Sequence, residues 1–170
     1  MYDGESLVRR AAIAATSAGA LPVIVVLGAD AEQISSAMSD LPAITIAFNA
    51  QWQTGLASSL STGLRALEGS DIDAALVTLA DQPLVDGPAL ERLMSAFGDD
   101  RRIVASAYQG TIGVPAIFGK EHIPDLLQLT GDKGAGAWLR QRPDELTLVP
   151  LSAAAVDIDT REDTARLGDG

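Results

Sequence analysis

Short uncharged runs that alternate with amphipathic stretches restrict the fold of this chain more than any other feature. The clearest run, residues 74–80, contains only apolar residues and one threonine and ends at Asp81-Gln82-Pro83. Such a run is typical of a strand that is covered on both faces of a parallel sheet. Ligands of these sheets bind beyond the carboxyl ends of the strands. Asp81 is therefore the first candidate functional residue, although capping a turn or the following helix explains its position equally well.

Periodicity along the rest of the chain predicts helices at residues 5–18, 31–38, 55–67, 88–97, 121–127, 131–141 and 161–167, and strands at 22–28, 44–47, 74–80, 103–107, 113–118, 146–151 and 156–158. This alternation predicts an α/β fold with a doubly wound, mostly parallel sheet. No repeat or linker divides residues 1–170, so we expect a single domain. A doubly wound sheet usually opens with a strand, whereas this chain opens with a helix. We therefore expect the first strand to be missing and the domain to be truncated at its N-terminus.

Composition excludes several classes of protein and site. The net charge of -11, with only 12 scattered Lys and Arg residues, argues against a nucleic-acid surface. The chain has no cysteine and a single histidine, which excludes thiolate and histidine-rich metal sites. Any metal ion would be held by oxygen atoms, as Mg²⁺ is. No apolar run approaches the roughly 20 residues of a membrane span, and the N-terminus has no features of a signal peptide, so we expect a cytoplasmic protein that binds no membrane.

A second acidic motif, Val156-Asp157-Ile158-Asp159-Thr160, repeats the pattern of an apolar strand end followed by acids. Carboxylates from two strand ends could share a divalent cation at one edge of the sheet, where Mg²⁺ carrying nucleotide phosphates is often held. Asp159 is preferred over Asp157, because alternate residues of a strand point to opposite faces. The alternative is that Asp159 or Thr160 caps the last predicted helix.

Three glycine-containing segments are further candidates for ligand contact. In the first, Gly55 permits close backbone approach and Ser58 and Ser59 offer hydroxyls in a first helical turn, although such residues also begin ordinary helices. In the second, Gly113 and Pro115 indicate either a backbone that approaches a ligand or a bulge. The third, residues 131–136, resembles a phosphate-binding turn without the spacing of a Walker loop, and capping a helix is the alternative.

Taken together, five segments resemble in order and spacing the molybdenum cofactor cytidylyltransferases, relatives of the molybdenum cofactor guanylyltransferases. The segments are Asn49-x-x-Trp52-x-x-Gly55-Leu56-Ala57-Ser58-Ser59-Leu60, Leu79-Ala80-Asp81-Gln82-Pro83, Gly113-Val114-Pro115-Ala116-Ile117-Phe118, Gly131-Asp132-Lys133-Gly134-Ala135 and Asp157-Ile158-Asp159-Thr160-x-Glu162-Asp163. Each is weak alone, but the set spans almost the whole chain. The guanylyl branch more often has a methionine where Gln82 stands.

The resemblance implies a Rossmann-like nucleotidyltransferase that moves CMP from CTP to the terminal phosphate of molybdopterin and releases pyrophosphate. It implies Mg²⁺ on Asp81 and Asp159, both catalytic, and a recipient molybdoenzyme or its chaperone as a possible partner. Carried over residue by residue, it implies nucleotide contacts at Gly55, Ser58, Ser59 and Asp81, and pterin contacts at Gly113, Pro115, Asp132, Lys133 and Gly134.

Two departures from the family pattern stand out. Arg161 replaces a proline that commonly opens the last helix. More importantly, the family's opening strand, its Leu-Ala-Ala-Gly turn and the Ser, Arg, Gly and Lys residues that hold the triphosphate are absent. Nucleotidyl transfer depends on positioning and charge neutralisation, so this loss bears directly on activity. The alternatives are a nucleotidyltransferase that uses GTP or a sugar-phosphate acceptor, and a non-catalytic pterin-binding or chaperone module.

Overall fold

The computed structural model describes residues 5–41, 44–98 and 103–158 of the chain. In these residues, β1 (Val23–Leu27) pairs with β2 (Ile44–Phe48), while four strands form a second sheet in the order β3-β5-β4-β6. The bounds of these four are β3 (Ala74–Val77), β4 (Ile103–Tyr108), β5 (Thr111–Gly119) and β6 (Leu146–Pro150). The α-helices are α1 (Leu7–Ser17), α2 (Ala31–Ser36), α3 (Leu56–Arg65), α4 (Gly87–Ala96), α5 (Ile123–Leu126) and α6 (Ala135–Leu139).

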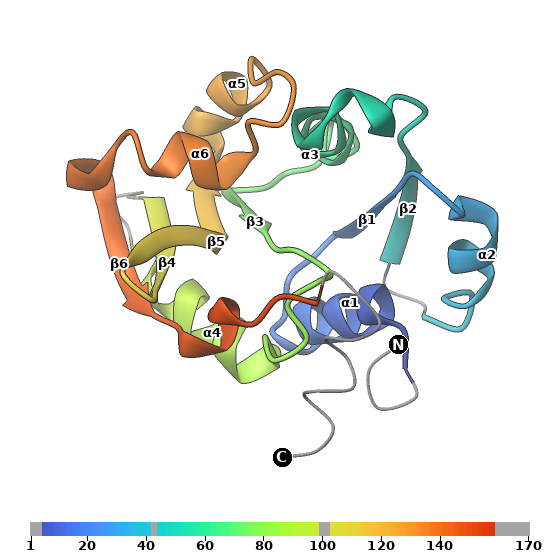
Figure 1. Cartoon of the computed structure of the whole chain (residues 1–170), viewed down its shortest axis with the longest axis horizontal. Helices are drawn as coiled ribbons and strands as arrows, with labels where there is room; N and C mark the ends of the chain where they lie inside the picture. Colours follow the sequence, from blue (N-terminus) through green and yellow to red (C-terminus); the bar gives the residue numbers. More distant parts are fainter. Residues whose placement is uncertain (1–4, 42–43, 99–102, 159–170) are drawn as a thin grey trace.

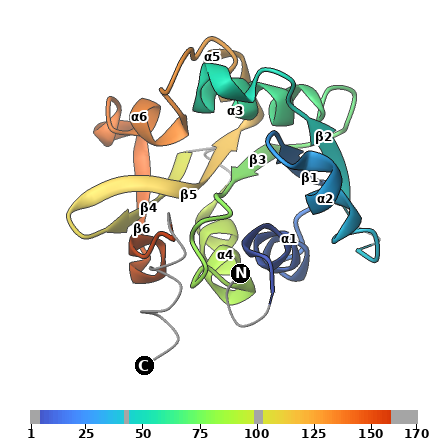
Figure 2. The same cartoon turned by 45° about the vertical axis from the view of Figure 1, so that its right-hand side comes forward.

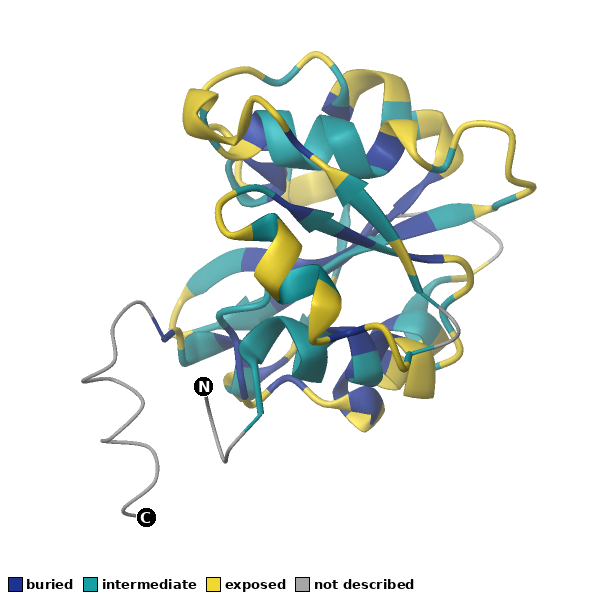
Figure 3. Ribbon diagram, turned by 90° about the vertical axis from the view of Figure 1, so that its right-hand side faces the viewer, coloured by how far each residue is buried: buried dark blue, intermediate teal, exposed yellow. Residues whose placement is uncertain are grey.

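Helices cover both sides of the strands, as expected for an α/β fold. Figure 1 shows α3, α5 and α6 on one side and α1 and α4 on the other, and the turned view in Figure 2 keeps the same arrangement. Each side has its own buried apolar cluster, and burial is concentrated in the strands and the inner helix faces (Figure 3). The α/β class predicted from the sequence is confirmed.

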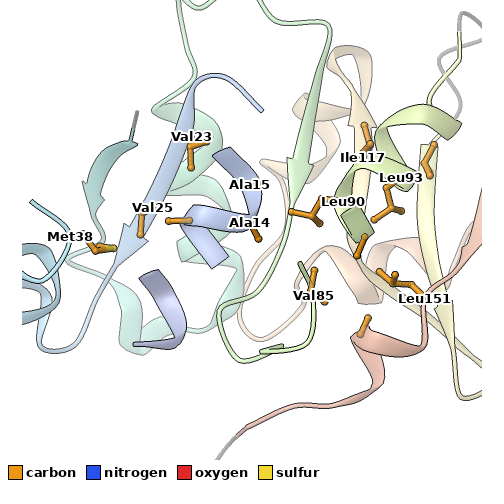
Figure 4. Packing of buried hydrophobic residues seen from close by; sticks show 14 of the residues in the cluster. Ala14, Ala15, Val23, Val25, Met38, Val85, Leu90, Leu93, Ile117 and Leu151 are labelled. Carbon is orange, nitrogen blue, oxygen red and sulfur yellow. The ribbon is translucent and has the colours of Figure 1, made fainter. Parts of the chain in front are cut away.

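Small side chains let α1 approach its neighbours closely. Ala12, Ala14 and Ala15 of α1 are buried in the cluster shown in Figure 4, together with Val23 and Val25 of β1. On the α4 side, a Cβ atom at Gly87 would lie only 3.2 Å from the Cβ of Ser17. An alanine-rich face therefore serves here as a packing surface, in agreement with the amphipathic helix predicted for residues 5–18.

The strand pairing is mixed and not mostly parallel as expected, because β4 and β5 form a hairpin. β1 with β2 and β4 with β6 are parallel, but β5 is antiparallel to both β3 and β4. Gln109 and Gly110, which alone separate β4 from β5, have φ angles of 46° and 75°. Positive φ at both central residues is the signature of a two-residue hairpin turn, and so short a connection can join only antiparallel strands.

A β-bulge interrupts the pairing of β4 with β5. Ala105 lies opposite Ala116 and Ser106 opposite Gly113, so Val114 and Pro115 form the extra length of β5. Proline is tolerated inside a sheet at such a position because a bulge lacks regular ladder hydrogen bonds. The buried Ser106 hydroxyl donates to the Pro115 carbonyl at 2.6 Å, which satisfies a group that the bulge removes from the ladder.

Other boundaries differ from the prediction at their ends. β3 stops at Val77, since residues 78–80 have no ladder partner among the described residues. The predicted strand at 156–158 is wrong: this segment is irregular, although the Ile158 amide donates to the Asp81 carbonyl at 2.8 Å. α6 is shorter than residues 131–141, because Gly131 has a φ of 62° and the helix begins only after Gly134. The helix predicted at 161–167 lies outside the described residues.

Replacing Ser106 by alanine tests the role of the bulge. Ser106→Ala leaves the Pro115 carbonyl without its donor in a fully buried site, so we expect the free energy of unfolding to fall by about 1–3 kcal/mol. Urea denaturation followed by circular dichroism measures this loss. The matched control is Ser152→Ala at an exposed position, with an expected change within about 0.5 kcal/mol. Equal effects of the two substitutions would contradict this role.

Candidate functional site

Asn49 connects the ends of β1 and β2 to the first turn of α3. Asn49 is buried, and its backbone amide donates to the Leu27 carbonyl at 2.8 Å. Its side-chain Nδ2 donates to the hydroxyls of Ser58 at 2.8 Å and Ser59 at 3.0 Å, and its Oδ1 accepts from the Gln51 amide at 2.9 Å. Every polar atom of this side chain is therefore used to hold one loop and one helix start in place.

The two serines of this turn have different roles. The single hydroxyl hydrogen of Ser58 has two carbonyl acceptors within reach, Gln51 at 3.0 Å and Gly55 at 2.8 Å, so this hydroxyl is engaged within the loop. The side chain of Ser59 accepts from Asn49 and lines a cavity. Of the two predicted nucleotide contacts, Ser59 has the more suitable position.

Gly55 allows a second loop to pack directly on the start of α3. Its φ of 113° and ψ of 173° fall in a region that only glycine occupies readily. A Cβ atom there would lie 2.4 Å from the Gly131 carbonyl carbon and 2.7 Å from Asp132 Oδ1. The Ala57 amide donates to the Gly131 carbonyl at 3.0 Å. One of the backbone amides of the first helical turn is thus used to hold the 131–134 loop.

The two loops and the turn after β1 border an open cavity of about 490 Å³, lined by Gly28, Ala29, Trp52, Gln53, Gly55, Leu56, Ser59 and Asp132. On one wall, Trp52 packs so closely on Gly28 that a Cβ atom at Gly28 would lie 2.5 Å from the Trp52 Cβ. On the other, Gly134 lies against Leu56, where a Cβ atom would be 2.4 Å from Leu56 Cδ2. Residues expected to face the nucleotide and residues expected to face the pterin therefore share one cavity.

Gln82 joins the end of β3 to two other segments. Its Nε2 donates to the carbonyl of Val114 in the β5 bulge at 3.2 Å and to that of Ala154 at 3.0 Å. Together with the hydrogen bond from Ile158 to Asp81, these contacts fix the loop after β3 from two sides. Asp81 itself is half-buried at this junction.

Tyr108 lies within reach of the charges of several segments. Burial and then the negative charge of Asp157 raise the pKa of Tyr108 above its usual value of 10.0, a hydrogen bond with Gln82 and the charge of Arg140 oppose this shift, and Asp81 adds the smallest contribution, which also raises the pKa. The Tyr108 hydroxyl packs against Gly113, where a Cβ atom would lie 2.4 Å from the hydroxyl oxygen. The alternation of a strand favours Asp159 over Asp157 as a site residue. Residues 156–158 form no strand, however, and the charge of Asp157 acts on the same tyrosine as the charge of Asp81.

The remaining predicted residues differ in position. Pro115 is fully buried, so it shapes the β5 bulge and does not line the cavity. Lys133 is exposed and is also absent from the cavity lining. Asp159, the second predicted metal ligand, lies outside the described residues. In the described part of the chain, no three His, Asp or Glu side chains gather as a ready metal cage.

Sequence reasoning did not assign a role to Asn49, Tyr108 or Arg140. Asn49 opens a quoted motif and directly follows a predicted strand, which is a signal that could have found it. Tyr108 precedes the Gln-Gly turn, and recognising the hairpin would have placed it beside Gly113. Arg140 donates to the Ile112 carbonyl at 3.1 Å, a contact between distant segments with no local sequence signal.

Comparison with known families agrees with this geometry. Residues 1–146 match the MobA-like NTP transferase domain. The chain belongs to this family. It is a nucleotidyltransferase by family, and its recognition from the five sequence segments is confirmed.

Individual relatives differ in what they are named for. The nicotine blue oxidoreductase of Paenarthrobacter nicotinovorans is 30% identical over 98% of this chain and 84% of its own length. A nucleotidyl transferase from Methanothermobacter thermautotrophicus is 26% identical, with a TM-score of 0.82 over 99% of this chain and 82% of its own. Rv0371c from Mycobacterium tuberculosis in complex with manganese is 23% identical and shares the fold, with a TM-score of 0.81 over 100% of this chain and 90% of its own. No helix in the described residues is long and apolar enough to cross a membrane.

Gly55→Ala tests the contact between the two loops. We expect it to lower the free energy of unfolding by about 2–4 kcal/mol, because backbone strain adds to a clash with Gly131. The control is Gly69→Ala, at a φ of 86° with no atom within 4 Å, which carries strain alone and should cost about 1 kcal/mol. Thermal denaturation of both variants separates the clash from the strain. A Gly55→Ala cost no larger than that of Gly69→Ala would contradict the contact.

Titration of Tyr108 tests the proximity of Asp157. In a Tyr2→Phe background Tyr108 is the sole tyrosine, and we expect it to ionise above pH 10.0. Asp157→Asn removes a negative charge that opposes tyrosinate, so it should lower the pKa of Tyr108, whereas Arg140→Gln should raise it. Ultraviolet absorbance of the tyrosinate measures both shifts. The exposed Asp144→Asn is the control, and an Asp157→Asn titration identical to it would refute the interaction.

Proposed function

We propose that this chain transfers CMP from CTP to the terminal phosphate of molybdopterin and releases pyrophosphate. The observation that carries the proposal is the packing of Gly55 against Gly131 and Asp132. This contact joins the segment that resembles a nucleotide site to the segment that resembles an acceptor site, so both substrates would meet in one cavity. The choice of CTP rests on the resemblance of the Asp81-Gln82-Pro83 segment to the cytidylyl branch.

In the proposed reaction an oxygen of the acceptor phosphate attacks the α-phosphorus of CTP. The new bond joins the two phosphates, the bond from the α-phosphorus to the bridging oxygen breaks, and pyrophosphate leaves with that electron pair. Such a transfer requires alignment of the two phosphates and neutralisation of charge more than covalent participation by the protein. A rigid cavity with fixed loops is what this chemistry needs.

Carboxylates in the segment after β3 fit a hard divalent cation. Asp81 is half-buried, the charges of Asp81 and Asp157 both act on Tyr108, and the chain has no cysteine and a single histidine, so oxygen atoms are the donors that it offers. Asp81 and Asp159 are the residues proposed to hold Mg²⁺. When bound, the cation would supply neutralisation of phosphate charge. The Mycobacterium tuberculosis relative is described with manganese, another divalent ion.

The chain's own residues would mainly position the substrates. Asn49 keeps the first turn of α3 in place, so that Ser59 presents its hydroxyl to the cavity. Gln82 holds the β5 bulge against the loop that carries Asp81. Gly134 lies against Leu56 of the cavity wall and Gly113 lies against Tyr108, so glycine permits close packing at both places. Each of these residues would orient a substrate or a loop, and correct orientation of the reacting groups lowers the barrier to phosphoryl transfer.

Pyrophosphate release tests the reaction and its specificity. The chain is incubated with Mg²⁺ and molybdopterin together with either CTP or GTP, and then with a sugar 1-phosphate as the alternative acceptor. We expect release only with molybdopterin, and faster release with CTP than with GTP. Faster release with GTP would show that CTP is the wrong nucleotide. Release with the sugar phosphate but not with molybdopterin would show that molybdopterin is the wrong acceptor. Molybdopterin binding without release from either nucleotide would instead support the non-catalytic pterin-binding module.

Asp81→Asn and Asp159→Ala test the proposed metal ligands. Loss of a ligand should lower kcat on the order of a thousandfold, and the double variant should be little worse than either single one, because both serve one metal. Asp144→Asn, at an exposed carboxylate outside the cavity lining, is the matched control and should retain activity. Thermal denaturation of the same samples distinguishes a role of Asp159 as a helix cap, which affects stability, from a role as a metal ligand, which affects the rate. An Asp159→Ala variant that loses about 1 kcal/mol of stability but keeps its rate would remove Asp159 from the site.

A further inference from the structure

Trp52 presents an aromatic ring at the border of the open cavity beside the start of α3. It begins the short 3-10 helix Trp52–Thr54, lines the cavity and is 44% exposed. Tryptophan is highly buried on average in folded proteins. An indole that remains exposed at a cavity is therefore a candidate for contact with a ligand.

Gly28, directly after β1, holds this ring in place. A Cβ atom at Gly28 would lie 2.5 Å from the Cβ of Trp52, 2.6 Å from its Cγ and 3.1 Å from its Cδ1. Gly28 does not have a positive φ angle, so the backbone conformation does not require glycine there. What requires glycine is the space that Trp52 occupies. The position of the indole is thus defined by β1 as well as by its own loop.

The walls of the cavity are fixed by contacts within the protein. The Gln51 amide donates to Asn49 Oδ1 at 2.9 Å, and the Trp52 amide donates to the Asn49 carbonyl at 3.4 Å. On the other wall, Leu56 is 47% exposed and packs on Gly134, whose φ of -83° does not require glycine either. The cavity therefore has two exposed apolar side chains, each packed on a glycine of another segment. A preorganised site of this kind loses little entropy when it binds a ring.

The charge of the cavity favours an uncharged part of a ligand. Asp132 is the one ionisable residue of the lining, and its Oδ1 lies beside Gly55, 2.7 Å from the position of a Cβ atom there. A carboxylate in a lining without a cationic side chain repels phosphate, whereas it accepts hydrogen bonds from amino groups. The cavity is therefore suited to the ring of a substrate and not to its phosphates.

We propose that this cavity binds a planar heterocyclic ring that carries an amino group, with the ring stacked on Trp52 and the amino group donating to Asp132. Stacking on an aromatic side chain recognises the π-face of the ring, and the carboxylate recognises its edge. The inference rests on the proposed function in one respect, that this cavity receives a substrate. Cytosine, guanine and pterin are all rings of this kind, and their relative affinities decide which of them occupies the cavity.

The indole signals of the two tryptophans in nuclear magnetic resonance spectra test the stacking. Trp52 is exposed, whereas Trp138 is buried in contact with Phe118, His122 and Arg142 and serves as an internal reference. The full chain, labelled with nitrogen-15, is titrated without metal ion with cytidine, guanosine and pterin. Uridine and lumazine, which have a carbonyl group in place of the amino group of cytidine and pterin, are the matched controls, and ribose is the control without a ring.

We expect at least one amino-bearing probe to shift the indole signal of Trp52 and to leave that of Trp138 in place. Ribose should shift neither signal. The carbonyl analogue of a probe that binds should bind about tenfold more weakly, because it offers Asp132 no amino group.

Substitutions at the cavity distinguish stacking from general stability. Trp52→Leu removes the aromatic face and should weaken binding about tenfold or more, whereas Trp52→Tyr should retain most of the affinity. Gly28→Ala keeps the indole but displaces it, so it should also weaken binding. The matched control is Phe48→Leu, at an aromatic residue that is 61% exposed and does not line the cavity, and its affinity should be unchanged. Affinities are measured from the backbone amide signal of Ser59, and an unchanged Trp138 signal verifies the fold.

No shift of Trp52 with any amino-bearing probe, or equal affinities of the Trp52→Leu and Phe48→Leu variants, would overturn the proposal. Equal binding of a probe and its carbonyl analogue would overturn the role of Asp132. The probes carry no phosphate, so transfer cannot occur during the titration. Ring binding without pyrophosphate release would contradict the proposed function alone, and release without ring binding at Trp52 would contradict this inference alone.

Discussion

Two hydrogen bonds donated by the side-chain amide of Gln82 hold together the segments around Asp81. One nitrogen serves carbonyl groups of the β5 bulge and of the segment after β6, and the residue before it is Asp81. Buried carbonyl groups without partners are costly, so the bulge, the loop after β3 and residue 154 are stable only together. The backbone at Asp81 is thus held by segments that are far apart in the chain.

A second junction, at the start of α3, follows the same physical logic with different means. There the buried side chain of Asn49 satisfies two hydroxyls, and glycine replaces a side chain where two loops touch. At both junctions, buried polar contacts and close backbone packing hold loops in place, which is typical of sites where positioning governs the chemistry. The family relation agrees with this interpretation. A relative that matches 98% of this chain is named as an oxidoreductase, so the reaction has to be argued from the site and not from the fold.

Much of the fold could be predicted from the sequence because its elements are strongly periodic. The strand at 23–27 and the helix at 7–17 were predicted nearly to the residue, since uncharged runs and an alanine-rich amphipathic face are local signals. The parallel pairing was overestimated because the Gln109-Gly110 turn was not read as a hairpin. The strand predicted at 156–158 failed for a different reason: alternation of apolar and acidic residues does not distinguish a paired strand from an extended segment held by one hydrogen bond.

The sequence by itself determined the α/β class, the family and the place of Asp81 in the segment that follows a buried strand, because composition, periodicity and motif order are properties of the linear chain. Only the tertiary structure decided that Ser59 and not Ser58 faces the cavity, that Pro115 is buried, and that Asp157 acts on Tyr108. It also decided that Trp52 packs on Gly28 at the border of the cavity. These outcomes depend on contacts between residues distant in sequence, whose hydrogen bonds and burial are established only when the chain is packed.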